Sequence, residues 1–253
     1  MGRALLIAAV LATGCGAELN QGGADAPAGP SNDAGVTDDA LGLDAATDAP
    51  ACANGRVLYL NFEGQALTQA ATSDATTNRA SWMNQASGTA TPFRQASGNR
   101  TTDIMTITDG IRAVLAGFPV TVVTTRPAAG PYVMVVFGGS AGAVGSNFSL
   151  AVNELDCDDS ENSDVLWISD ASGVPLQRLI NVAVGGIGFG LGLTATADPN
   201  DCMCGWTNGC TPTSAQNCTL SMSIARDQGA GQLCPAGGAS QNELLAFDQA
   251  FCQ

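Results

Sequence analysis

The residues able to do chemistry in this chain are limited to carboxylates and thiols. The 253-residue sequence contains no His, and its nine basic residues are all Arg. This composition excludes a His-ligated zinc site, a Ser-His or Cys-His dyad and a histidine pH switch. Any metal site or acid–base chemistry would therefore have to use Asp, Glu or Cys.

Carboxylates are concentrated between residues 154 and 164, in the run Glu-Leu-Asp-Cys-Asp-Asp-Ser-Glu-Asn-Ser-Asp. Oxygen ligands at alternating positions suit calcium, which makes Asp156, Asp158 and Glu161 candidate ligands. The run lacks the Gly and the terminal Glu of an EF-hand loop. A solvated acidic surface is the alternative interpretation.

Nine cysteines are present, and Cys15 stands apart from the others. The remaining even number predicts up to four disulfides in an oxidising compartment. The candidates are Cys52, Cys157, Cys202, Cys204, Cys210, Cys218, Cys234 and Cys252. A thiolate metal site at Cys202, Cys204, Cys210 and Cys218 is disfavoured, because the spacings are not those of paired C-x-x-C zinc ribbons.

The most informative stretch runs from Leu179 to Met203 and is rich in Gly. Metzincin zinc peptidases carry H-E-x-x-H-x-x-G-x-x-H, in which three His bind zinc and the Glu polarises a zinc-bound water. With Gly192 at the turn glycine, the first His and the Glu fall on Gly185 and Gly186. The second and third His fall on Phe189 and Ala195, so all four chemical positions are empty.

The frame around these positions is retained. The matrixin branch of the metzincins often continues past its third His as x-x-D-P-x-x-x-M, and Asp198, Pro199 and Met203 stand in that register. The domain therefore resembles a matrixin-like metzincin with a degenerate site. The resemblance places Met203 where the methionine beneath the metal lies, and it implies an inactive domain that does not bind zinc.

Simpler interpretations of the same stretch remain open. It could be a Gly-rich buried helix without any link to peptidases, and interior glycines would cost such a helix about 1 kcal/mol each. The glycines match neither a full dinucleotide-binding fingerprint nor a phosphate loop. The length approaches a membrane span, but the Gly/Ala/Thr content and the cysteines that follow disfavour one.

Apolar periodicity predicts the elements that would position this stretch. Strands are expected at 56–62, 119–125, 132–137 and 164–169, a weaker strand at 143–152, and helices at 102–117 and 240–252. We expect Thr101 or Thr102 to cap the first helix and a Ser240/Glu243 capping box to begin the last. The polar stretch 64–100 is interpreted as a long surface insertion anchored by Trp82 and Phe93.

These elements define an α/β (α+β) fold: a mixed twisted sheet with two main helices, followed by a disulfide-rich C-terminal subdomain. The order resembles that of a metzincin catalytic domain, in which the weak strand would be the edge that binds extended peptide. The predicted divisions are a metzincin-like domain over 52–203 and a cysteine-rich subdomain with a final helix over 204–253.

The N-terminus predicts export. Residues 1–14 resemble a lipoprotein signal peptide, which would make Cys15 the lipidated first residue of the mature chain; an ordinary cleaved signal is the alternative. Residues 15–51 are acidic and poor in apolar side chains, as expected of a disordered tether. The destination would be a bacterial cell envelope, in the outer membrane or periplasm, with an extracellular location as the alternative.

The functional expectation is a lipid-anchored pseudopeptidase that binds a peptide or envelope protein. A net charge of −14 disfavours nucleic acid as a partner and leaves the N-terminal lipid as the membrane contact. No feature indicates an oligomer. The alternatives are an active metallopeptidase with carboxylate ligands such as Asp198 or Asp201, and a disulfide-stabilised envelope protein of unrelated fold.

Overall fold

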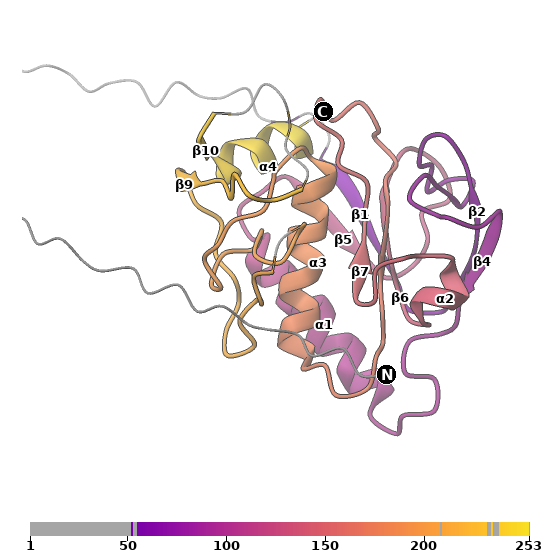
Figure 1. Ribbon diagram of the computed structural model, residues 1–253. Helices are drawn as coiled ribbons and strands as arrows, with labels where there is room; N and C mark the ends of the chain where they lie inside the picture. The colour runs from indigo at the N-terminus through magenta and orange to yellow at the C-terminus, as the bar shows by residue number, and fades with distance from the viewer. Residues whose placement is uncertain (1–51, 53–54, 208, 232–233, 235–237, 253) are drawn as a thin grey trace, which may run out of the picture. The chain divides into compact units, whose positions relative to one another are not determined.

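The computed structural model describes residues 52, 55–207, 209–231, 234 and 238–252, and its centre is a five-stranded sheet (Figure 1). The strand order is β5-β1-β6-β8-β7. The first four strands are parallel, and β7 pairs antiparallel with β8. The bounds are β1 Arg56–Asn61, β5 Val120–Val123, β6 Val133–Phe137, β7 Ala151–Val152 and β8 Val165–Ile168. The strong strands expected from the sequence are thus confirmed, with a mixed sheet.

Side-chain alternation divides the sheet between two hydrophobic clusters. Leu58 and Leu60 of β1 belong to the cluster shared with α1 (Arg100–Val114) and α3 (Leu176–Gly190). Tyr59, between them, belongs to the cluster on the opposite face. Because both faces are covered, β6 is buried along its whole length, as parallel strands in α/β folds are.

The second face is covered by the stretch 64–100, so the prediction of a surface insertion was wrong. This stretch forms a three-stranded sheet of order β3-β2-β4, with β2 Gln65–Gln69, β3 Arg79–Ala80 and β4 Ser87–Ala90. Its buried side chains are mostly small, including Ala75, Ala80 and Ala90. Small residues give a weak apolar signal, which is why periodicity did not reveal the packing.

The structure corrects two local expectations for elements that precede α3 in the chain. The cap of α1 is Asn99, without a side-chain hydrogen bond, rather than Thr101 or Thr102. The weak strand expected at 143–152 is reduced to β7, because a helical turn, α2 (Ala141–Val144), occupies its beginning and ends at Gly145 in the left-handed conformation. Only glycine adopts that conformation without steric cost.

The final helix, α4 (Glu243–Phe251), is capped by Asn242, whose side chain accepts from the Leu245 amide at 3.0 Å. The expected Ser240/Glu243 box is absent, because Ser240 belongs to β10 (Ser240–Gln241), paired with β9 (Ile224–Ala225). The Glu243 carboxylate instead accepts from the Ser221 amide at 2.9 Å.

Four disulfides are formed, which confirms the cysteine expectation. The pairs are Cys52–Cys252, Cys157–Cys234, Cys202–Cys218 and Cys204–Cys210. The thiolate metal site is contradicted, since its four cysteines are oxidised in two pairs. The described residues beyond Met203 also pack: Trp206, Phe247 and Phe251 join the same core as β1 and α3.

All described residues fall within one compact unit, residues 48–253. The predicted signal peptide, Cys15 and the acidic tether up to residue 51 lie outside the described residues. Among the helices that are described, none has both the length and the apolar character needed to cross a membrane.

Candidate functional site

The site centres on the helix α3, which ends just before Gly192. Its last residue is Gly190, and Gly192 follows with φ +83°. The Leu193 amide then donates to the Gly188 carbonyl at 3.0 Å, which closes the helix end. Gly185 and Phe189 lie four residues apart on one helical face, so side chains at these two positions would lie next to each other.

Trp206 occupies the space in front of these two positions. A Cβ added to Gly185 would collide with the Cys202 carbonyl oxygen and lie 2.6 Å from Trp206 Nε1. At Gly186 the added atom would lie 2.6 Å from Trp206 Cζ2 and 2.7 Å from a methyl group of Leu166. The glycines are therefore required by packing, and there is no room for a His or Glu beside the indole.

The ring of Phe189 completes this packing. It stacks on Trp206 with centroids 5.2 Å apart and an interplanar angle of 27°. Trp206 is 7% exposed and Phe189 2%. Two apolar rings thus fill the space beside Gly185 and Gly186.

The residues after α3 form a tight buried turn. Ala195 is fully buried, and its carbonyl accepts from the Asp227 amide at 2.8 Å. Met203 lies against α3, with its Sδ 2.7 Å from the position of a Cβ on Gly188. Asp198 and Pro199 form the exposed tip of the turn, where Asp198 Oδ1 accepts from the Asn200 amide.

Asp201 is committed to holding this turn. Its Oδ1 accepts from the Met203 amide at 2.8 Å and from Thr196 Oγ1 at 2.9 Å. The buried Glu243 faces it, and burial together with the Asp201 charge raises the pKa of Glu243 to about 8. This acid pair is a structural clamp, because both side chains are hydrogen-bonded to backbone inside the protein.

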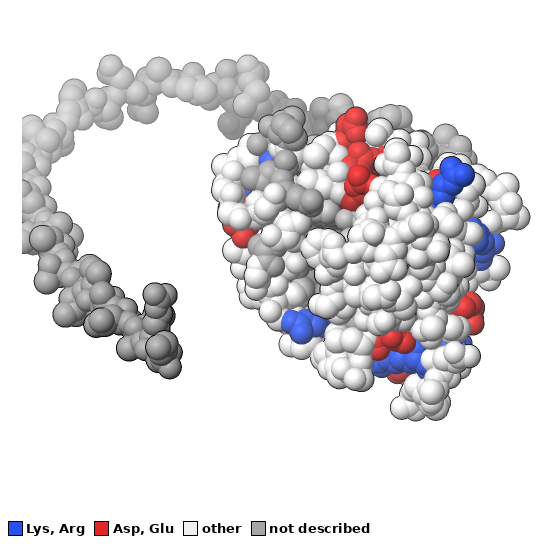
Figure 2. All heavy atoms as spheres, turned by 45° about the vertical axis from the view of Figure 1, so that its right-hand side comes forward, with Lys and Arg blue, Asp and Glu red and all other residues white. Residues whose placement is uncertain are grey.

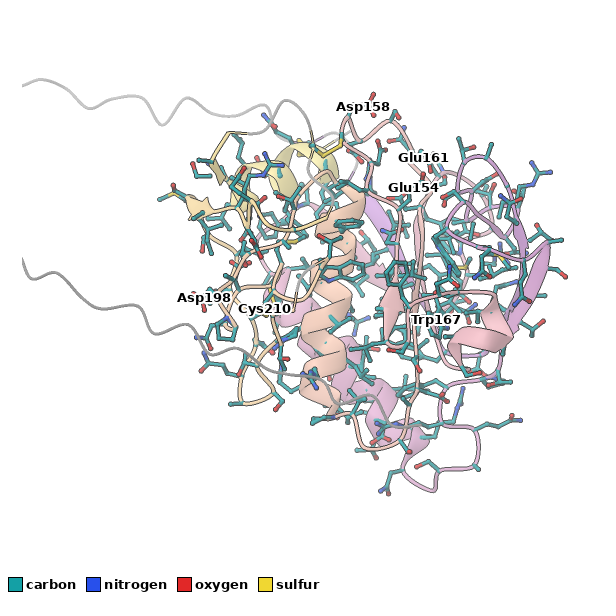
Figure 3. All side chains as sticks on the ribbon, viewed as in Figure 1. Glu154, Asp158, Glu161, Trp167, Asp198 and Cys210 are labelled. Atoms are coloured by element: carbon teal, nitrogen blue, oxygen red, sulfur yellow. A yellow bond between two sulfur atoms is a disulfide. The ribbon has the colours of Figure 1, made fainter. Side chains whose placement is uncertain are left out.

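The three calcium candidates do not converge on a common point. Asp156 is buried and accepts from the Glu161 amide at 2.7 Å, while the Glu161 carboxylate accepts from the Ser73 amide at 3.0 Å. Asp158 is exposed, and Figure 3 shows it apart from Glu161. In the described part of the chain, no group of three or more His, Cys, Asp or Glu side chains is arranged to hold a metal ion. The arrangement of these carboxylates therefore does not support a calcium site.

Asp164 is a buried acid that the sequence did not single out. It is 2% exposed, and burial, reinforced by the charges of Glu161 and Asp156, raises its pKa to about 8. Its Oδ1 has no hydrogen-bond partner. The neutral acid is therefore the form that the folded chain favours at pH 7.

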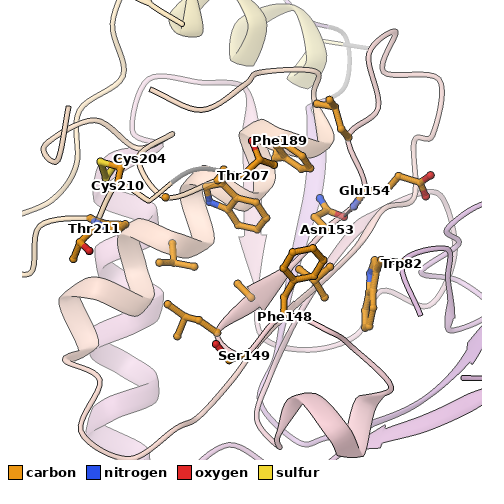
Figure 4. A pocket seen from close by; sticks show the side chains of 18 of the residues that line it. Trp82, Phe148, Ser149, Asn153, Glu154, Phe189, Cys204, Thr207, Cys210 and Thr211 are labelled. Carbon is orange, nitrogen blue, oxygen red and sulfur yellow. Dashed lines mark hydrogen bonds between the residues drawn. A yellow bond between two sulfur atoms is a disulfide. The ribbon is translucent and has the colours of Figure 1, made fainter. Parts of the chain in front are cut away.

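A cleft of about 540 Å³ runs between α3 and the edge of the main sheet (Figure 4). One wall is the segment 148–155, which contains β7, and the other is the α3 face with the loop 204–212. Four aromatic residues, Trp82, Phe148, Phe189 and Trp206, lie in the lining among polar and aliphatic residues. Phe148 is 60% exposed. On the face of the molecule shown in Figure 2, uncharged residues predominate and the charged side chains lie in small groups.

Two features hold the walls in place. Asn153 Nδ2 donates to the Gly186 carbonyl at 2.9 Å, linking the edge segment to α3. On the other side, the buried Asn181 accepts from the Cys218 amide and donates to the carbonyls of Thr213 and Gln216. The cleft is therefore built on fixed elements, with disulfide Cys204–Cys210 in its lining.

Comparison with known proteins does not assign this site. No protein-family model matches the chain, and no curated protein matches it.

Proposed function

We propose that this protein is a non-catalytic peptide-binding protein with a metzincin-like architecture, exported and anchored by an N-terminal lipid. The element order supports the architecture, since it agrees with the order expected from that resemblance. Further support comes from the antiparallel edge strand β7 and from the turn of the chain at Gly192.

The observation that carries the loss of catalysis is the position of Trp206. Its indole covers Gly185 and Gly186 and stacks on Phe189. Without a metal, water at neutral pH is a poor nucleophile, since coordination is what lowers its pKa to about 7. Asp201, an alternative ligand in principle, is 1% exposed and turned to the backbone.

The cleft supports binding. Strand β7 is the last strand of its sheet, and it forms part of one wall of a cleft whose lining includes four aromatic residues. An edge strand can accept an extended peptide by backbone hydrogen bonds, while adjacent pockets hold alternate side chains. Four disulfides favour an oxidising compartment and so agree with export.

Two measurements on the mature protein, purified without a His tag, test this proposal. Elemental analysis should find no stoichiometric zinc, and fluorescein-labelled pentapeptides should bind saturably without being cleaved. Replacing the exposed Phe148 by Ala should weaken binding, whereas Met105→Ala, at the similarly exposed Met105 on α1, should not. Stoichiometric zinc with peptide hydrolysis would overturn the proposal, as would a complete absence of peptide binding.

A further inference from the structure

The α3 wall of the cleft is charged at one end. Arg178, Val182 and Phe189 lie on one helical face and line the cleft, with Trp206 packed between the last two at Gly185. Arg178 is in the first turn of α3. Eleven residues at about 1.5 Å each separate it from Phe189, so the wall is roughly 16 Å long.

Arg178 lacks the carboxylate partner that several other arginines of the described residues have. Arg56, Arg94 and Arg100 form ion pairs with Asp159, Asp103 and Glu63. Within the described residues, Arg178 forms no ion pair, and its buried Nε has no hydrogen-bond partner. A buried donor without an acceptor is costly, and an oxygen of a ligand could offset that cost.

The position of Arg178 in the helix adds to the positive potential. A helix N-terminus bears a partial positive charge, so a cation there is unfavourable and an anion is favourable. The first turn of α3 contains no acidic residue to offset it. In a chain of net charge −14, this end of the cleft is therefore a local anion-attracting point.

The opposite end is acidic. The bond from Asn153 to the Gly186 carbonyl places the neighbouring Glu154 toward the C-terminal part of α3. Glu154 lines the cleft, one of its carboxyl oxygens is buried without a partner, and Glu161 and Asp156 lie close enough to raise its pKa. This end would repel a carboxylate and attract a cation.

We propose that the cleft selects peptides with a carboxylate at their C-terminal end, bound by Arg178, with the preceding apolar side chains on the aromatic lining. This inference rests on the proposed peptide-binding function. At about 3.3 Å per extended residue, the α3 wall accommodates about five residues. Either a free carboxyl terminus or an acidic side chain would supply the carboxylate that binds Arg178.

The charge arrangement also sets the direction of the peptide. The segment 148–155 and α3 run the same way. Strand β7 is antiparallel to β8, and Asp164, which directly precedes β8, lies beside Gly190 at the C-terminal end of α3. A peptide whose C-terminal end lies at Arg178 therefore runs opposite to β7. That is the direction for antiparallel pairing with this edge strand.

Fluorescence anisotropy with three labelled pentapeptides of the same apolar core tests the inference. One has a free carboxyl terminus, one a C-terminal amide, and one a C-terminal amide with Glu as its last residue. Charge-assisted hydrogen bonds predict at least about tenfold tighter binding of the first or third than of the second. The first against the third identifies which carboxylate is preferred.

Variants locate the effect. Arg178→Gln should abolish the preference, Arg178→Lys should retain part of it, and Arg79→Gln, at an exposed arginine outside the cleft lining, should leave it unchanged. Equal affinity for all three peptides would overturn this inference while leaving peptide binding intact. Failure of every peptide to bind would instead refute the proposed function on which it rests.

Discussion

The indole of Trp206 stacks on the ring of Phe189 and lies across Gly185 and Gly186, within one packed layer on α3. The indole and the glycines depend on each other. Gly at these positions weakens the helix, and the aromatic ring fills the space that larger side chains would take. The layer closes the floor of the cleft beside Gly185 and Gly186.

Removing the indole should therefore open a cavity. Trp206→Gly is expected to lower the free energy of unfolding by about 3–5 kcal/mol, as large-to-small changes in a core do. An apolar cavity of this shape can bind an apolar guest, so added indole should raise the melting temperature of the variant and not that of the wild type. Thermal denaturation checks both. A variant as stable as the wild type would contradict the packing described.

Gly185 provides a second test of the layer. Gly→Ala inside a helix ordinarily stabilises by about 1 kcal/mol. Gly185→Ala should instead destabilise by about 2 kcal/mol or more, because the added Cβ would collide with the Cys202 carbonyl oxygen and crowd Trp206. Gly142→Ala in α2 is the control, since a Cβ there meets nothing within 4 Å. Urea denaturation of both variants should show opposite signs.

The same contacts bear on any attempt to restore a zinc site. A His at residue 185 would meet the Cys202 backbone and the Trp206 ring, so restored ligands alone should not bind zinc while Trp206 is present. Gly185→His, Gly186→Glu, Phe189→His and Ala195→His together are expected to remain free of zinc in elemental analysis. Stoichiometric zinc in a folded quadruple variant would show that the layer yields easily.

An element could be predicted from the sequence when large apolar side chains bury it. The strands Val133–Phe137 and Val165–Ile168 are unbroken apolar runs, and Val120–Val123 has three Val and one Thr, so these strands were predictable. The cover at 64–100 was missed, because it packs through Ala75, Ala80 and other small side chains. Alanine contributes little to a periodic signal.

Less of the site than of the fold could be predicted from the sequence. The spacing around Gly192 indicated the empty positions, but the residue that fills them, Trp206, lies in a short cysteine loop without periodicity. Consecutive glycines on a buried helix were the available signal, since they imply a close neighbour. Arg178 was missed because only the structure reveals that its buried Nε lacks a partner. Disulfide pairing was also inaccessible, since eight cysteines allow roughly a hundred pairings.

The four disulfides should differ in their contributions. In the chain-entropy description, a crosslink stabilises more when it closes a longer loop. Cys52–Cys252 spans 200 residues and Cys204–Cys210 spans 6. Replacing both cysteines by Ser should cost about 5 kcal/mol for the first pair and about 2 kcal/mol for the second. Denaturant titration measures the two costs, and the reverse order would indicate that packing at the Trp206 loop dominates.

The buried acids should make stability depend on pH in an uncommon direction. Glu243 and Asp164 each have a pKa of about 8 in the fold, because burial and neighbouring acids disfavour the charged form. In the unfolded chain such groups titrate near pH 4. Between these values the folded state holds more protons than the unfolded state, so stability falls as pH rises. The decline ends above about pH 8, where both states are deprotonated.

The melting temperature is thus expected to be higher at pH 5 than at pH 8. Each acid contributes up to about 1.4 kcal/mol per pH unit across that window. Asp164→Asn mimics the neutral acid, so it should leave stability at pH 5 little changed, raise it at pH 8 and flatten the slope. Asp248→Asn, at an exposed carboxylate on α4, should preserve the wild-type slope. A wild-type melting temperature that rises from pH 5 to pH 8 would mean that Asp164 and Glu243 are ionised in the fold, each with its charge compensated.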